Sequence, residues 1–160
     1  MEKFIDKLSS YNLLNNLLPG AVSCFLMKVY WDKNILSSNV IECIFIYYFM
    51  GLVISRVGSV IVEPICKKCK WVKFADYDQY ISASKSDSKL DSLSEANNTF
   101  RTMFAMCLIL LVGKLYIYIC QAIKIIGAVE KEIVLFGLIL LFACSYRKQT
   151  QYIKKRTEKM

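Results

Sequence analysis

Histidine is absent from this 160-residue sequence, and proline and glycine are scarce, with 2 and 6 residues. Without histidine, the chain lacks the commonest general base and the commonest metal ligand of proteins. A shortage of turn-forming residues favours helices over a turn-rich β architecture. The sequence also contains no phosphate-binding glycine loop, nucleophile elbow or HExxH motif. We therefore predict that the protein is not an enzyme and that it holds no cofactor and no metal.

The 7 cysteines lack the pattern of a disulfide framework, because their number is odd and their spacings are irregular. Most lie in apolar runs, where cysteine behaves as a small hydrophobic residue. Cys66 and Cys69 form a lone CxxC pair. A structural zinc site needs four ligands, so a zinc ion would have to be bound by Cys66 and Cys69 from each of two subunits of a dimer. Two cytoplasmic thiols in a basic patch are the simpler interpretation.

What the chain has in abundance is apolar residues, which make up 56% of it and give a mean hydropathy of +0.38. A soluble domain of this length has too little interior to bury so much apolar surface. The apolar residues also occur in long runs and not at the spacing of an amphipathic helix or strand. The sequence therefore predicts an all-α polytopic membrane protein with four transmembrane helices.

The runs divide the chain into two transmembrane hairpins. The first hairpin covers residues 1–64, with spans at 11–30 and 40–62, and the second covers residues 102–146, with spans at 102–123 and 131–146. Between them lies a polar segment, 65–101, and a basic tail follows at 147–160. In an alternative reading, residues 1–17 form an amphipathic helix on the membrane surface and the first span begins at Leu18.

Most of the 21 lysines and arginines fall in the N-terminal head, the middle segment and the tail. Basic residues gather on the cytoplasmic side, so both termini and the segment 65–101 are expected in the cytoplasm. Glu63–Pro64 is expected to end the second helix, since proline is a common terminator. Ser92 and Glu95 match a capping box, so the third helix is expected to begin near residue 92.

Two charges are predicted inside the spans: Lys114 near mid-bilayer, and Arg56 about two turns from the cytoplasmic end of the second helix. Each costs at least ~2.5–3.5 kcal/mol to insert, so each needs a partner or water. Helical spacing sets Arg56, Ser59 and Glu63 on one face. Glu42 and Glu130 are the partners expected for Lys114. Either these charges line a polar pathway or gate, or they are ion pairs that fix helix packing.

Small and polar residues suggest how the spans pack. Asn12 and Asn16 form a polar stripe that should face another helix or water. Gly51, Ser55 and Ser59 recur every four residues, a spacing that lets two helix backbones approach closely. This contact could lie within one chain or between copies. Because four thin spans bury little area alone, we expect a homo-oligomer.

The segment after the second span holds two candidate contact surfaces. The first is a basic cluster with an aromatic residue, suited to anionic lipid headgroups: Lys67, Lys68, Lys70, Trp71 and Lys73. The second is a polar and aromatic stretch that could dock a cytoplasmic protein or pack against the chain's own helices: Asp76, Tyr77, Asp78 and Tyr80. The net charge of +8 is explained by topology and lipid contact, so no direct nucleic-acid binding is expected.

The whole-chain pattern resembles small four-span membrane components of bacterial antiphage defence operons, and most of all the membrane subunit of the Kiwa system. The segments Asn-Asn-Leu-Leu-Pro-Gly at 15–20 and Ser-Arg-Val-Gly-Ser at 55–59 have the look of family signatures. The resemblance implies a bacterial inner-membrane anchor or sensor that oligomerises and recruits a cytoplasmic effector. Alternatives are a pore-forming effector that depolarises the membrane, with Lys114, Arg56 and the asparagine stripe along its path, and a transporter accessory subunit.

Overall fold

The computed structural model describes residues 10–31, 35, 37–87, 89–122 and 130–157, and every regular element in these ranges is helical. The helices and turns are α2 (Ser10–Trp31), α3 (Val40–Val57), η1 (Gly58–Val62), α4 (Glu63–Lys68), α5 (Tyr77–Ser86), α6 (Lys89–Ala122) and α8 (Glu130–Thr157). The all-α prediction is confirmed.

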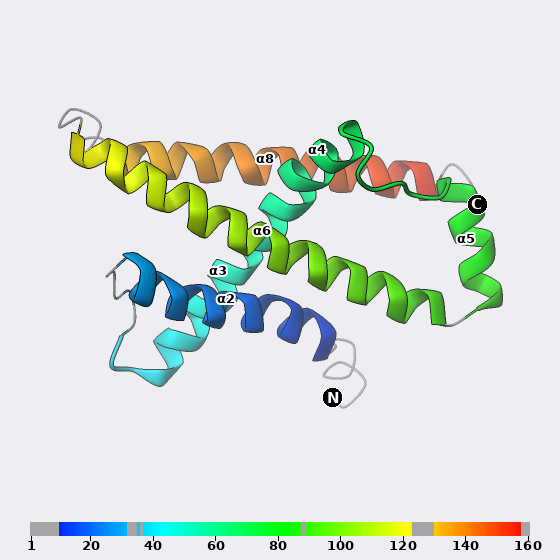
Figure 1. Ribbon diagram of the computed structural model, residues 1–160. Coiled ribbons are helices and arrows are strands. Elements are labelled where there is room, and N and C mark those ends of the chain that lie inside the picture. The colour runs from blue at the N-terminus through cyan, green and yellow to red at the C-terminus, as the bar shows by residue number, and fades with distance from the viewer. Residues whose placement is uncertain (1–9, 32–34, 36, 88, 123–129, 158–160) are drawn as a thin grey trace.

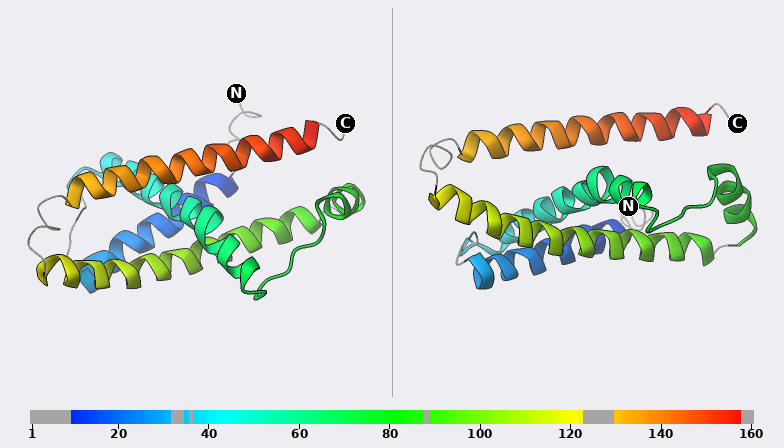
Figure 2. Two further views of the ribbon diagram at one scale, coloured as in Figure 1. Left: turned by 90° about the horizontal axis from the view of Figure 1, so that it is seen from above. Right: turned by 45° about the horizontal axis from the view of Figure 1, so that its top comes forward.

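The long helices form an elongated bundle with two distinct ends (Figure 1). The start of α2, the helix α5 and the end of α8 lie at one end, which we call the arm end. The other end, which we call the hairpin end, holds the end of α2, the start of α3, the end of α6 and the start of α8. The continuous helix α3–η1–α4 crosses between α2 and α6 on one side and α8 on the other (Figure 2).

Within the described residues, three helices are long and apolar enough to cross a membrane: Val40–Lys68, Lys89–Ile119 and Ile133–Gln151. At most 17% of the most apolar part of each is buried inside the protein, so their apolar side chains face outward. Such an inverted surface is expected where lipid, and not water, is the solvent. The chain is therefore a candidate multi-pass membrane protein. The helix α2 is not among the three, and its asparagines at 12, 15 and 16 lower its hydropathy.

Glu63–Pro64 does not end the second helix, as the sequence suggested; the helix continues to Lys68. The π-helical turn η1 comes just before the proline. In this turn the Glu63 N–H bonds the Gly58 carbonyl, five residues back. Proline is tolerated here because it stands in the first turn of α4, where its missing N–H breaks no α-helical bond.

The third long helix, α6, begins at Lys89 and not near residue 92. The carboxylate of Asp87 accepts the Lys89 N–H at 2.9 Å, so aspartate supplies the N-terminal cap. Ser92 and Glu95 consequently lie inside the helix and form no capping box. The helix α8 runs unbroken to Thr157, so it continues from the predicted fourth span into the predicted basic tail.

Two glycines set the closest approach of α2 and α3. A Cβ atom on Gly51 would overlap the backbone carbonyl of Asn16, and one on Gly20 would overlap that of Tyr47. The two backbones therefore touch, as small residues permit. Nearby, Ile54 and Ala105 are almost fully buried in the small core that joins α3 to α6.

Candidate functional site

The Glu63 carboxylate, whose side chain is 8% exposed, meets three cations. Lys67 approaches its Oε1 at 2.8 Å, Arg101 of α6 approaches Oε2 at 2.7 Å, and Lys148 of α8 lies 3.5 Å from Oε1. One carboxylate thus joins α4, α6 and α8 at the arm end of the bundle. We call this group the Glu63 cluster.

The three cations contribute unequally because they differ in exposure. The Lys67 side chain is 42% exposed and one helical turn away, so this pair is worth only ~0.3–0.5 kcal/mol. The side chains of Arg101 and Lys148 are 21% and 25% exposed. Their attraction to Glu63 is less screened by water, so these two inter-helix pairs supply most of the electrostatic stabilisation. The cluster as a whole carries an excess of positive charge.

Lys148 has a second role that depends on the π-helical turn. Residue 64 is proline and has no N–H, and the Glu63 N–H is used by Gly58. The Ser59 carbonyl is therefore denied both of its usual backbone donors. The Lys148 ammonium donates to this carbonyl and also lies 3.0 Å from the Ser59 hydroxyl. A side chain of α8 thus supplies the hydrogen bond that the backbone of the crossing helix lacks at Ser59.

Arg56 does not join Glu63, although the sequence places them seven residues apart on one helical face. The π-helical turn lies between them and takes about one extra residue per turn, which rotates Glu63 away from that face. Among the described residues, no ion pair of Arg56 is found, and its side chain is partly exposed. Ser59, the third member of the predicted stripe, instead contacts Lys148.

Lys114 lies at the hairpin end, beside the last turn of α2, and among the described side chains it forms no ion pair with an acidic residue. Its ammonium donates to the Tyr30 carbonyl at 2.8 Å and lies 5.3 Å from the centre of the Tyr118 ring. The indole N–H of Trp31 donates to the Leu110 carbonyl at 3.1 Å in return. A lysine is well suited to the unpaired carbonyls at a helix C-terminus. Lys114 therefore ties α2 to α6.

Of the two partners expected for Lys114, only Glu42 has a described side chain. Glu42 lies exposed in the first turn of α3 and takes part in no ion pair among the described side chains. The side chain of Glu130 lies outside the described ones. The polar residues predicted to line one path are thus separated: Lys114 marks the end of α2, and Arg56 sits midway along the crossing helix.

The polar stripe of α2 is partly accounted for. Asn16 is 7% exposed and faces Gly51, while the neighbouring Asn15 accepts a hydrogen bond from the Thr99 hydroxyl at 3.1 Å. The side chain of Asn12 lies outside the described ones. Of the small residues proposed for packing, Gly51 contacts α2, Ser59 contacts α8 and Ser55 is half-buried. The contacts seen for Gly51 and Ser59 lie within one chain.

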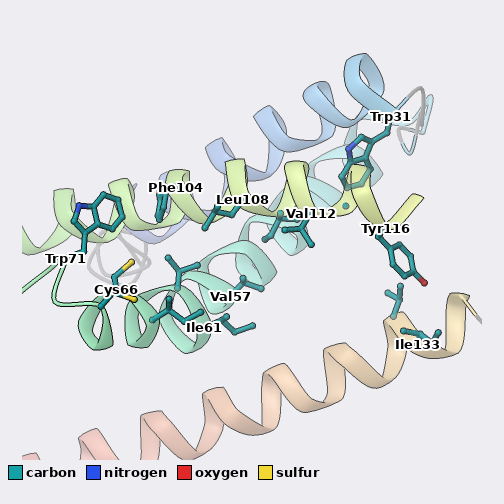
Figure 3. A pocket seen from close by; sticks show the side chains of 16 residues that line it. Trp31, Val57, Ile61, Cys66, Trp71, Phe104, Leu108, Val112, Tyr116 and Ile133 are labelled. Atoms are coloured by element: carbon teal, nitrogen blue, oxygen red, sulfur yellow. The ribbon is translucent and has the colours of Figure 1, made fainter. Parts of the chain in front are cut away.

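An apolar groove of about 730 Å³ runs along α6 on the side that faces α8 (Figure 3). Its floor is formed by Val57 and Ile61 of the crossing helix, and its wall by α6 between Phe104 and Tyr116. At the hairpin end it is bounded by Trp31 and the start of α8. Polar atoms contribute almost nothing to its lining.

Trp71 borders the other end of the groove because of a sharp turn after α4. The N–H of Trp71 bonds the Cys66 carbonyl at 3.0 Å and the N–H of Lys70 bonds the Lys67 carbonyl at 3.1 Å, the pattern of a Schellman motif. Lys70 occupies the left-handed position, with φ 57°, where glycine is usual. The turn sets the Trp71 ring edge-on to Phe104, 5.4 Å between centres.

The two thiols of the CxxC pair, Cys66 and Cys69, also line this groove. Within the described ranges, no three histidine, cysteine, aspartate or glutamate side chains lie close enough to share a metal ion. The lysines of the predicted basic cluster surround the same turn: Lys67 lies 4.0 Å from the centre of the Phe74 ring, and Lys68, Lys70 and Lys73 are exposed.

Residues 70–99, which we call the arm, connect the crossing helix to the buried part of α6. The helix α5 contacts α6, and it carries partly buried side chains at helical spacing, which include Tyr77 and Tyr80. Asp76 and Asp78 are exposed. The predicted docking stretch is therefore divided, because its tyrosines are partly buried and its aspartates are exposed.

Sequence reasoning missed the partners that matter most to Glu63. Arg101 was counted with the polar segment and Lys148 with the tail, as topology signals only. Both stand one or two residues beyond a predicted span end, at the level where a charged side chain can reach inward. The signal available in the sequence was a glutamate at the end of an apolar span, since such a carboxylate needs cations if it is buried.

No known protein family, curated protein or solved structure matches this chain.

Proposed function

We propose that this chain is a four-span bacterial inner-membrane anchor or sensor that presents the arm in the cytoplasm to a soluble effector. The observation that carries the proposal is the continuity of α6. This helix runs for 34 residues from the arm through a candidate span. Binding of a partner at the arm would therefore move the membrane part of α6, and a movement of that part in the bilayer would move the arm.

The position of the Glu63 cluster supports this role. It lies where the arm meets the bundle, and it ties α6 to the crossing helix and to α8. A carboxylate that holds three cations from three helical segments can release or hold the arm as a unit. The cluster thus serves as the mechanical junction of the proposed anchor.

The arrangement of the helix ends and the charge distribution support four spans and cytoplasmic termini. The helix α2 is as long as the candidate spans require, touches α3 along its backbone and is tied to α6 at both ends by Thr99 and Lys114. Its start lies at the arm end with α5 and the end of α8 (Figure 1). With α2 crossing the membrane, these segments share the basic, cytoplasmic side.

The topology is tested with one native cysteine and two terminal tags. Cys69 is exposed at the arm end, so a membrane-impermeant maleimide should label it in inside-out vesicles and not in intact cells. Protease should remove tags at both termini only from inside-out vesicles. Tags that become accessible from opposite sides would exclude four spans and leave α2 on the membrane surface.

The partner is tested by purification of the full-length chain from its own host in mild detergent. We expect a soluble protein at fixed stoichiometry, lost when Asp76 and Asp78, both exposed on the arm, are changed to asparagine. Asp91→Asn combined with Glu95→Gln removes the same two charges from other exposed positions on the arm and serves as the control. Equal recovery with all variants, or no soluble protein at all, would contradict the proposal.

An antiphage setting is part of the proposal and rests on the resemblance of the whole-chain pattern. It predicts that deletion of the gene raises phage plating on the native host. Homo-oligomerisation, which is expected because four thin spans bury little area alone, is tested by the native mass of the purified complex. A monomeric mass in both detergent and nanodiscs would remove that element and leave the anchor role standing.

A further inference from the structure

We propose that the groove along α6 is a binding site for one anionic phospholipid, with an acyl chain in the groove and the headgroup at the lysines of the turn after α4. The proposal goes beyond the anchoring role, since a site for an individual lipid is not needed to hold a protein in a bilayer. It rests on the shape and lining of the groove, the charge at its mouth and the geometry of the turn.

The lining of the groove fits an acyl chain and little else. Apolar side chains cover its floor and wall, and polar atoms are nearly absent. Along α6 it extends from Phe104 to Tyr116 (Figure 3), twelve residues or roughly 18 Å. One leaflet of a bilayer contributes about half of a ~30 Å hydrocarbon core. A chain that enters at the Trp71 end therefore fits within the length of the groove.

The charge at the mouth selects the headgroup. Trp71, Cys66 and Cys69 border the groove, and Lys68, Lys70 and Lys73 are exposed within two residues of one of them. The fourth lysine of the cluster, Lys67, is held by Glu63 and Phe74 and is less available. Exposed lysines beside an apolar opening attract an anionic headgroup, and tryptophan is favoured at the headgroup level.

The conformation of Lys70 is the third line of support. A left-handed residue other than glycine costs on the order of 1 kcal/mol, yet a lysine stands here with φ 57°. Glycine would make the same turn without strain. The lysine instead brings a cation to the opening at which Trp71 meets Phe104. A role for the side chain of Lys70, and not for its backbone, accounts for this choice.

The turn offers a substitution that separates charge from structure. Lys70→Gly removes the ammonium and suits the left-handed backbone, so the fold should be kept or slightly stabilised. In native mass spectrometry of the delipidated full chain, phosphatidylglycerol should bind at least about fivefold more tightly than phosphatidylcholine, the effect expected of one lysine near the headgroup. Lys70→Gly should remove most of this preference.

A second variant blocks the groove itself. Ile61→Trp places a large side chain on the groove floor, and it should lower retention of both lipids by about tenfold or more. Ile139→Trp is the matched control, since Ile139 is comparably exposed on α8 but does not line the groove. Equal binding of the two lipids by the unmodified chain would overturn the proposal, and so would unchanged binding by Ile61→Trp.

A different occupant would also be recognised. A dimeric mass that Ile61→Trp reduces to a monomer, with no lipid retained by the unmodified chain, would assign the groove to a second copy and overturn the lipid site. Recovery of the soluble partner of the arm is measured separately, so failure of the lipid site and failure of the proposed function give different results.

Discussion

The ammonium of Lys148 on α8 donates to the backbone carbonyl of Ser59, a group that the proline at 64 leaves without its usual donor. The same ammonium lies 3.5 Å from the Glu63 carboxylate. The attachment of α8 to the bundle therefore depends on this lysine as much as on apolar contact. Along α8, Leu141 and Ser145 are buried on the same face, and Phe142 meets Phe49 at 6.5 Å between ring centres.

Loss of the negative charge in the Glu63 cluster should destabilise the protein strongly. Glu63→Gln keeps the size of the side chain but leaves three cations without their shared anion. Breaking a buried pair in this way costs about 3–5 kcal/mol, which corresponds to roughly 6–20 °C in unfolding temperature for a chain of this length. Thermal unfolding in detergent measures it.

Two further variants check the cause of that loss. Lys67→Ala should lower the unfolding temperature by no more than about 1–2 °C, because its pair with Glu63 is exposed and worth ~0.3–0.5 kcal/mol. Lys148→Met should be costly alone but less than additive with Glu63→Gln, because each removes the same contact. Additive losses would mean that the two side chains act independently.

The contact of α2 with α3 predicts opposite effects for two glycine substitutions. Gly51→Ala should cost about 1–3 kcal/mol or more, since its methyl group would overlap the Asn16 carbonyl. Gly137→Ala meets nothing within 4 Å and should be neutral or stabilise α8 by up to about 1 kcal/mol. Similar unfolding temperatures for the two variants would show that the close backbone approach is not needed.

The sequence was sufficient to predict the all-helical class and the positions of the long apolar helices, because long apolar runs leave no alternative in a chain of 160 residues. It was not sufficient to place the charges. The face on which Glu63 lies depends on a π-helical turn, and hydrophobic periodicity assumes 3.6 residues per turn throughout. Pro64 was read as a terminator, although its missing N–H is harmless at the start of α4.

The same reasoning explains the error over Lys114. Counting residues from the start of a predicted span measures depth along that helix, but it carries no information on where a neighbouring helix ends. The partner of Lys114 is a backbone carbonyl at the end of α2, and every helix has such carbonyls whatever its sequence. A search for acidic side chains could not find it.

Replacement of Lys114 separates a structural lysine from one that lines a pore. Lys114→Leu should lower stability by about 1–3 kcal/mol, because the Tyr30 carbonyl loses its donor, and Lys114→Arg should restore most of it. Ion flux in proteoliposomes should stay at the protein-free level for all three proteins. A flux in the unmodified chain that Lys114→Leu changes would favour the pore-forming alternative over the anchor.

Pro64→Ala should uncouple α8 from the crossing helix. The new N–H at residue 64 can bond the Val60 carbonyl, so the helix can become regular through Gly58–Val62 and rotate Glu63 by about 100°, the angle of one residue. The coupling between Glu63→Gln and Lys148→Met, measured as a double-mutant cycle of unfolding free energies, should then fall toward zero. Pro19→Ala, a change of the other proline in the chain, should leave it intact. Undiminished coupling in Pro64→Ala would mean that the π-helical turn is held by the packing of α8 and α6 around it, and not by the proline.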